Sequence, residues 1–152
     1  MRHEQGFSYP IVMFLVAVLA IISVRAMENS LTAARRDKEA ELLSVGQAYR
    51  KAIKAYYDGS PGTAKVYPSS LDDLLLDARG TQLRRPLRKR FRDPITGSAE
   101  WGLVRDESGA IKGIYSLSPS KPFKTGGFPV ELGHFTQATQ YRQWTFEYTP
   151  PK

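Results

Sequence analysis

The chain has 152 residues, which is enough for one membrane helix and one small domain but not for two sizeable cores. Hydrophobic residues make up 41% of it, and its formal net charge of +7 permits contact with anionic lipid, acidic protein or nucleic acid without selecting one of them. Cysteine is absent, which excludes disulfides and thiol chemistry. The two histidines are His3 and His134, and no glycine-rich phosphate-binding pattern occurs. We therefore expect neither an enzyme nor a bound cofactor.

The first predicted element is an uncharged apolar run, residues 7–24, which follows a short polar leader, residues 1–6. Its 18 residues would form ~27 Å of helix at ~1.5 Å per residue, close to the ~30 Å hydrocarbon core of a bilayer. A cleaved secretory signal is disfavoured, because Arg25 stands where a small-residue cleavage site is needed. A plain signal anchor fits the hydropathy. The run is therefore predicted to cross a membrane once.

The helix is predicted to continue through residues 25–58 as an amphipathic segment. No proline interrupts Met27–Tyr57, and Gly46 is the only glycine there. The charged side chains, Glu39 among them, lie largely off the apolar stripe, and the breaker cluster Asp58–Gly62 ends the helix. The stripe has spacings of three, four and seven residues and consists of Leu42, Val45, Tyr49, Ala52, Ile53 and Tyr56. One face of this helix is thus expected to carry a folded domain, residues 59–152.

The domain is predicted to combine short helical turns with a small antiparallel sheet. A short helix follows Pro68, where Ser69 and Ser70 each precede an aspartate by three positions and offer two capping boxes. Strands are expected at residues 100–105 and 110–117 around a hairpin loop, with Trp101, Leu103, Ile111 and Tyr115 on one buried face, and a last strand at residues 143–148. Residues 118–133 are predicted to form an irregular loop. The fold class is therefore α+β, a long N-terminal helix packed on a small antiparallel sheet.

The most basic stretch, residues 79–92, has two interpretations. Leu83, Leu87 and Phe91 recur every four residues, which predicts a short amphipathic helix interrupted near Pro86 with a solvated basic face. Alternatively the stretch binds nucleic acid or an acidic partner. We favour the first interpretation and do not favour nucleic acid, because stacking aromatics are few and no nucleic-acid motif frames the stretch. The residues of the alternative partner-binding patch are Arg84, Arg85, Arg88, Lys89, Arg90 and Arg92.

The junction Gly6-Phe7-Ser8, between a short charged leader and an apolar run, resembles the leader of type IV pilins and type II secretion pseudopilins. The segment Tyr67–Leu74, the turn Asp93–Gly97 with Trp101, and the pair Ser116-Leu117 look like the soluble part of a major pseudopilin. The resemblance implies that prepilin peptidase cuts after Gly6 and methylates Phe7. It also implies that the helix packs against other subunits in a filament, and the residues we assign to that packing are Ile11, Phe14, Leu15, Val18, Leu19 and Ile22.

The resemblance further implies a location and a function. The chain would be a single-pass protein of the bacterial inner membrane, with its C-terminal domain periplasmic, and would then enter a periplasmic filament. Its partners would be other pseudopilins or pilins, prepilin peptidase and the inner-membrane assembly platform. As a pseudopilus subunit it would support protein export by type II secretion. The alternatives are a minor type IV pilin, acting in adhesion, motility or DNA uptake, and an uncut signal-anchored periplasmic domain.

The basic residues that flank the apolar run predict the opposite orientation. Arg2 alone precedes the run, whereas Arg25, Arg35, Arg36 and Lys38 follow it. By the positive-inside rule this count places the C-terminal domain in the cytoplasm. We adopt the orientation that the resemblance implies.

Two positions depart from the family pattern. The fifth mature position is usually a glutamate that neutralises the N-terminal amine of a neighbouring subunit, but here it is Ile11, and residues 7–24 contain no acid. We therefore expect a minor subunit rather than the main repeating one. Major pseudopilins commonly hold calcium in a C-terminal loop, and a calcium site needs six to eight oxygen ligands. Residues 118–133 contain a single acid, Glu131, so we expect no metal there.

Overall fold

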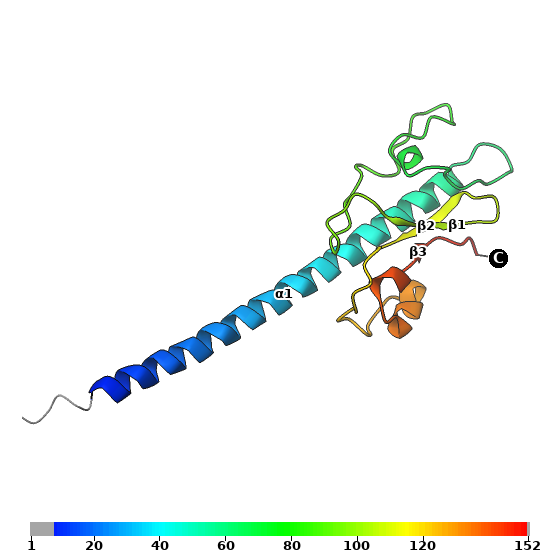
Figure 1. The fold of residues 1–152 in the computed structure, drawn as a ribbon. Coiled ribbons are helices and arrows are strands. Elements are labelled where there is room, and N and C mark those ends of the chain that lie inside the picture. Colours follow the sequence, from blue (N-terminus) through cyan, green and yellow to red (C-terminus); the bar gives the residue numbers. More distant parts are fainter. Residues whose placement is uncertain (1–7, 152) are drawn as a thin grey trace, which may run out of the picture. The chain divides into compact units, whose positions relative to one another are not determined.

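The fold is known from a computed structural model, which describes residues 8–151 (Figure 1). The element order along the chain is α1 (Ser8–Asp58), η1 (Asp72–Leu74), β1 (Gly102–Arg105), β2 (Ile111–Tyr115), η2 (Val130–Gln137), η3 (Tyr141–Gln143) and β3 (Phe146–Glu147). The chain divides within α1 into two compact units, Met1–Asp37 and Lys38–Lys152, hereafter the first and the second unit. The predicted α+β class, a long N-terminal helix with a small antiparallel sheet, is confirmed.

In the second unit, α1 forms one wall of the hydrophobic core. All six residues of the predicted stripe are buried, with Leu42, Tyr49 and Ile53 fully inaccessible. The prediction that Glu39 lies off the stripe is wrong, because its side chain is only 4% exposed. Glu39 precedes Leu42 by three positions, so the two side chains share one face of the helix. The packed part of α1 therefore begins at Glu39, and residues 25–38 are exposed.

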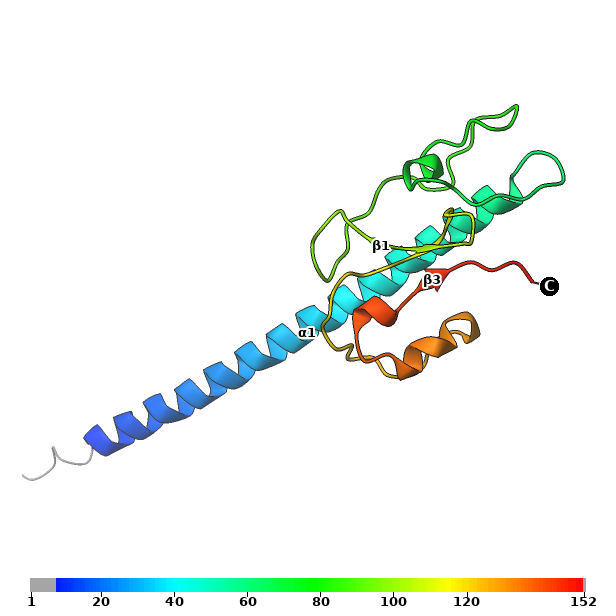
Figure 2. The ribbon, with the colours of Figure 1, turned by 45° about the vertical axis from the view of Figure 1, so that its right-hand side comes forward.

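The three strands form an antiparallel sheet in the order β1-β2-β3. The predicted hairpin is confirmed, and its loop is held by the Asp106 side chain, which accepts hydrogen bonds from the backbone N–H of Ser108 and Ala110. Figures 1 and 2 both show η1 (green) on the β1 side of the sheet and η2 and η3 (orange to red) on the β3 side. The strands are shorter than predicted, and η2 begins inside the segment predicted to be an irregular loop.

The predicted burial pattern of the hairpin is only partly correct, because Trp101 and Ile111 are buried whereas Leu103 is only partly buried. Ile111 and Ile114 are both buried, at 1% and 0% exposure, although an odd spacing of three would place them on opposite faces of a regular strand. The register explains this, because Val104 pairs with Gly113 whereas Arg105 pairs with Ile111. The extra residue in β2 forms a bulge that returns the two isoleucines to one face. Tyr115, predicted on the buried face, is only partly buried and covers Gly102 on the neighbouring strand.

The amphipathic helix predicted for residues 79–92 does not form. The segment is irregular, and its ordered backbone contacts reach outside it: Leu87 N–H donates to the Leu74 carbonyl, and Arg84 forms an isolated bridge with Asp77. Pro86 has no N–H to give to a helix, which explains why these long-range bonds prevail. Consequently Leu87 is buried whereas Leu83, predicted to be buried, is 70% exposed.

Helix α1 is in close contact with strand β3 at Gly46. A Cβ atom at this position would overlap the ring of Phe146 in β3. Phe146 is fully buried, and it also contacts the ring of Phe135 edge-on, with the centroids 5.1 Å apart. The helix can therefore lie against β3 only because residue 46 has no side chain.

We expect Gly46→Ala to destabilise the second unit. In an exposed helix this change gains up to about 1 kcal/mol, but here the added methyl group overpacks the core, which costs about 1–3 kcal/mol. The free energy of unfolding, measured by denaturant titration of the full chain in detergent, should fall. The matched control is Gly126→Ala, where a Cβ meets open space. Equal stability of Gly46→Ala and the wild type would contradict the close packing.

Candidate functional site

The candidate functional site is the apolar N-terminal part of α1, which no described residue covers. By length and composition the helix could cross a membrane once. Among the residues assigned to subunit packing, Ile11, Phe14, Leu15, Leu19 and Ile22 are 50–69% exposed and Val18 is partly exposed. Neighbours on the other sides of the helix, such as Met13 and Ile21, are exposed as well. A helix that is apolar all round is stable only in lipid or among other helices.

Polar groups at the end of the apolar run have local partners. The Ser23 hydroxyl donates to the Leu19 carbonyl at 2.8 Å, which removes the cost of an unpaired hydroxyl in an apolar environment. The first charges after the run form an ion pair between Arg25 and Glu28, with 3.4 Å between nitrogen and oxygen. The run is thus compatible with lipid up to residue 24. The predicted processing residues Gly6 and Phe7 lie outside the described residues.

The basic residues predicted as a partner-binding patch are all exposed, but they lie along an irregular segment and not on a helix. Arg90 pairs with Asp72 at 3.3 Å, and Arg92 donates to the Gly97 carbonyl at 3.3 Å. The Lys89 ammonium lies 5.2 Å from the centroid of the Phe91 ring. The remaining members of the patch, Arg84, Arg85 and Arg88, are on the same exposed segment. The structure therefore leaves these cations accessible to a partner.

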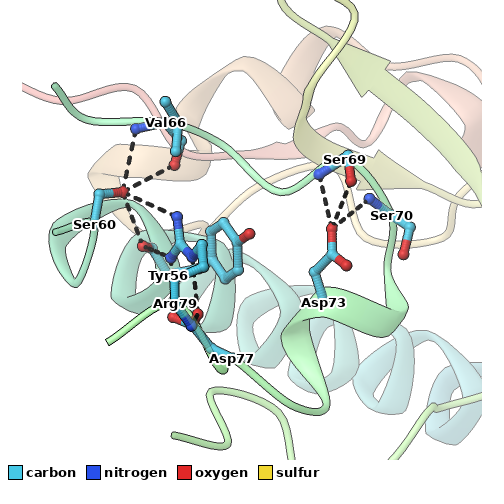
Figure 3. A network of polar contacts seen from close by, with 8 residues as sticks. All are labelled: Tyr56, Ser60, Val66, Ser69, Ser70, Asp73, Asp77 and Arg79. Atoms are coloured by element: carbon cyan, nitrogen blue, oxygen red, sulfur yellow. Dashed lines mark hydrogen bonds and ion pairs between the residues drawn. The ribbon is translucent and has the colours of Figure 1, made fainter. Parts of the chain in front are cut away.

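Arg79, although part of the same basic stretch, has a structural role (Figure 3). Its guanidinium donates to both carboxylate oxygens of Asp77, at 2.8 and 2.9 Å, and to the Tyr56 carbonyl at 2.8 Å. It also lies over the Tyr56 ring, 3.3 Å from the centroid. It also donates, at 3.2 Å, to the Ser60 hydroxyl, which accepts a further hydrogen bond from the Val66 N–H. The Arg79 guanidinium thus gives a hydrogen-bond donor to a free carbonyl in the last turn of α1, where a positive charge is favourable because it complements the helix dipole.

Asp73 organises the turn after Pro68 (Figure 3). One of its carboxylate oxygens accepts hydrogen bonds from the backbone N–H groups of Ser69 and Ser70 and from the Ser69 hydroxyl, at 2.8–3.0 Å. Burial opposes its ionisation, but these bonds outweigh burial and lower the pKa of Asp73. Neither predicted capping box forms in full: the Ser70 N–H donates to Asp73, but the Ser70 hydroxyl accepts from the Asp72 N–H, and the residue before η1 is Leu71, which makes no side-chain cap. The Asp72 carboxylate instead pairs with Arg90. The predicted short helix is a single 3₁₀ turn, Asp72–Leu74.

A buried aspartate joins two segments that are far apart in the sequence. Asp93 is fully buried, and its carboxylate accepts hydrogen bonds from the Ser116 hydroxyl at 2.6 Å and from the Thr96 hydroxyl at 2.9 Å. The turn Asp93–Gly97 and the pair Ser116-Leu117, quoted above as separate features, therefore meet at one hydrogen-bonded site. The sequence identified both segments but gave no signal for their contact.

Glu39 is a functional candidate that sequence reasoning missed. Its carboxylate accepts hydrogen bonds from the backbone N–H groups of Phe123 and Lys124, at 3.1–3.2 Å. These bonds fix the loop before η2 to α1. A carboxylate in phase with an apolar stripe is the pattern that could have predicted a buried acceptor at this position. The role is positional, because the partners are backbone groups.

Within residues 8–151 no group of three or more His, Cys, Asp or Glu side chains is arranged to hold a metal ion. His134 contacts the Thr145 hydroxyl at 3.3 Å, on an exposed surface. No family model, curated protein or solved structure matches the chain. Its function must therefore be inferred from the apolar helix, the basic segment and the architecture of the second unit.

We expect Asp77 to stabilise the second unit above about pH 4 and to lose this contribution in more acidic solution. The hydrogen bond from Arg79 lowers the pKa of Asp77, against the opposing effect of burial. A carboxylate with a depressed folded pKa stabilises the protein above its unfolded pKa, and this contribution is lost as the pH falls through the folded pKa.

The variant Asp77→Asn should therefore lose about 1.5–3 kcal/mol of unfolding free energy at pH 7, as expected for hydrogen bonds to charged groups. The loss should shrink as the pH is lowered from 5 to 2, when followed by thermal unfolding. The control is Asp72→Asn, whose exposed pair with Arg90 should contribute at most about 1 kcal/mol. A constant difference between Asp77→Asn and the wild type across this range would show that Asp77 acts only by packing.

Proposed function

We propose that the chain is a pseudopilin-like structural subunit of a type II secretion pseudopilus. The observation that carries this proposal is the exposure of the apolar N-terminal part of α1, in a helix whose C-terminal part carries an α+β unit. A plain anchor needs only an apolar run of this length. Two further features favour assembly: the helix continues without a break to Asp58, and the leader junction has the pattern Gly6-Phe7.

The proposed mechanism is structural. Prepilin peptidase removes residues 1–6 and methylates Phe7, and the assembly platform then draws the chain from the inner membrane into a periplasmic filament. Packing between apolar helices replaces the contacts with lipid, so the face with Phe14 and Leu15 meets neighbouring subunits. The second unit remains at the filament surface and contacts the exported protein or other subunits. No catalytic residue is required of this chain.

Ile11 determines which kind of subunit this is. Cleavage after Gly6 creates a positively charged amine at Phe7, and an unpaired charge in a bilayer costs at least ~2.5–3.5 kcal/mol. No acid in residues 7–24 can pair with it, and Ile11 is an exposed aliphatic residue of α1. A filament of this chain alone would repeat that cost in every subunit. We therefore propose a minor subunit that assembles beside subunits that supply an acid.

The processing step is tested by the intact mass of the full chain, extracted from cells with and without prepilin peptidase. With the peptidase, the mass should fall by residues 1–6 and rise by one methyl group. Gly6→Leu should prevent the cut because it enlarges the residue before the scissile bond, whereas the neighbouring change Gln5→Ala should not. An unchanged mass in the presence of active peptidase would refute the pseudopilin proposal and favour an uncut anchor.

The minor-subunit assignment is tested by assembly of the purified mature chain. The wild type alone should not form filaments, seen by sedimentation and electron microscopy, whereas Ile11→Glu should, because each acid can then neutralise the amine of a neighbour. The matched control is Val12→Glu, which introduces the same acid about 100° away around the helix. Efficient assembly of the wild type alone, or an Ile11→Glu variant that behaves like it, would contradict a minor role.

A further inference from the structure

Residues 77–84, hereafter the bridged loop, are closed at their base by backbone hydrogen bonds. The Asp77 N–H donates to the Arg84 carbonyl at 2.8 Å, and the Arg84 N–H donates back to the Asp77 carbonyl at 3.0 Å. Further from the tip, the Leu87 N–H donates to the Leu74 carbonyl. Figures 1 and 2 both show the segment after η1 (green) standing out from the rest of the second unit. The loop is therefore fixed at its base, and its tip is free of the core.

One face of the bridged loop lies against the end of α1. Asp77 is buried and binds the Arg79 guanidinium, which in turn donates to the Tyr56 carbonyl. Arg84, the partner of Asp77 in the bridge, reaches the same end of the helix, because a Cβ atom at Gly59 would lie 2.9 Å from the Arg84 Nη1. The side chains of the bridged pair thus point toward α1.

The residues next to the bridged pair face the other way. Successive side chains of an extended segment point to opposite faces, so the neighbours of a residue that points toward α1 point away from it. The exposure of these neighbours agrees, because Leu76 is 49% and Leu83 is 70% exposed, and both Ala78 and Arg85 are exposed. These four residues form the outer face of the bridged loop, which contains two leucines, an arginine and no acid.

The charge around the outer face is positive. Residues 78–92 contain seven cations and no acid. Two of the cations are paired with acids of the preceding segment, Arg79 with Asp77 and Arg90 with Asp72. Three others are exposed and form no ion pair within residues 8–151, namely Arg84, Arg85 and Arg88. The cations nearest to the tip therefore remain available to an anionic partner.

The exposure of Leu83 removes the alternative explanation of this charge. A solvated basic helix requires Leu83 to be buried beneath the cations, but no helix forms there and Leu83 is exposed beside them. A single exposed leucine is ordinary on a protein surface. Two leucines on one face of a loop that stands out, next to unpaired arginines, combine the apolar and cationic groups with which protein segments bind at a membrane interface.

We propose that the outer face of the bridged loop binds the surface of an anionic lipid bilayer. Leu76 and Leu83 enter the boundary between headgroups and acyl chains, and Arg85 meets lipid phosphates. A bilayer presents phosphate and hydrocarbon side by side, which suits both kinds of side chain. Nucleic acid offers no hydrocarbon to the leucines. A loop of this size is also too small to bury the ~800 Å² per partner that stable protein interfaces use.

The proposal does not depend on the chain being a filament subunit. The mass measurement above can fail while the loop still binds lipid, and the reverse also holds. The bilayer is either the one that α1 enters or a second one, and both present the same chemistry to the loop. The test has one arm for each.

The chain has no cysteine, so one introduced cysteine can carry a dye that brightens in apolar surroundings. Gln82→Cys places the dye at the tip and keeps Leu83, whereas the control Val130→Cys places it on η2, at a residue that is 99% exposed. The labelled full chain is held in phosphatidylcholine nanodiscs and mixed with vesicles of phosphatidylcholine, with or without phosphatidylglycerol. In the other arm the nanodiscs themselves contain phosphatidylglycerol and no vesicles are added.

The dye at residue 82 should brighten when phosphatidylglycerol is present, and the dye at residue 130 should not. Brightening in the nanodisc arm identifies the bilayer as the one that holds α1. Brightening only after vesicles are added identifies a second bilayer. Either result supports the proposal.

Two variants, in the chain labelled at residue 82, divide the contributions. Leu83→Ser should raise the lipid concentration at half-saturation about tenfold, because it removes the side chain that enters the bilayer. Arg85→Gln should raise it about fivefold, because it removes one charge from the surface contact. The matched controls, Val130→Ser and Lys121→Gln, make the same kinds of change at exposed positions outside the loop and should alter it less than about twofold. Near-UV circular dichroism checks that each variant is folded.

Three results would overturn the proposal. A dye at residue 82 that responds in neither arm would show that the loop does not meet lipid. An equal response to phosphatidylcholine alone would remove the role of the arginines. A Leu83→Ser variant that binds like the wild type would show attraction by charge alone, which an acidic protein or a nucleic acid supplies equally well.

Discussion

Helix α1 and strand β3 meet at Gly46, where the ring of Phe146 fills the space that a side chain would need. The rest of the second unit depends on this contact. A sheet of three strands, one of them only two residues long, cannot bury enough surface to be stable alone. The apolar stripe of α1 supplies the missing layer, and the aromatic rings of Phe135, Trp144 and Phe146 pack on one another beside it. The helix is therefore part of the core of the second unit and not only a stalk for it.

Much of the second unit lacks regular secondary structure, so side chains supply many of the hydrogen bonds that backbone groups would make to one another in a helix or a sheet. Buried N–H and C=O groups need partners, and in irregular segments these come largely from charged or hydroxyl side chains. Arg79 holds the end of α1, Asp93 joins a turn to the end of β2, and Glu39 fixes the loop before η2. Tyr49 does the same with its hydroxyl, which accepts from the N–H of Phe91 and donates to its carbonyl, and burial raises the pKa of Tyr49.

Sequence patterns correctly predicted the elements that are determined by residues close together in the chain. Three predictions were correct because each depends on neighbouring residues. They are the apolar stripe of α1, the end of the helix at Asp58 and the hairpin around Asp106. The failures involve partners distant in the sequence. The four-residue period of Leu83, Leu87 and Phe91 predicted a helix, but the bond from Leu87 to Leu74 and the bridge between Asp77 and Arg84 replaced it. The apolar run and the basic residues were recognisable from sequence, whereas the strand order β1-β2-β3 depends on pairing between distant residues, which no local pattern encodes.

The bond between Arg50 and Glu147 joins residues 97 positions apart, and it lies beside the contact of Gly46 with Phe146. This separation sets an order of events during synthesis. The stripe of α1 leaves the ribosome before the strand that covers it, because Glu147 follows Arg50 by 97 positions. Until then Leu42, Tyr49 and Ile53 have no complete core to enter, and contacts this distant form slowly. A chain that stops before β3 would leave the stripe uncovered. Productive folding therefore requires the residues of β3.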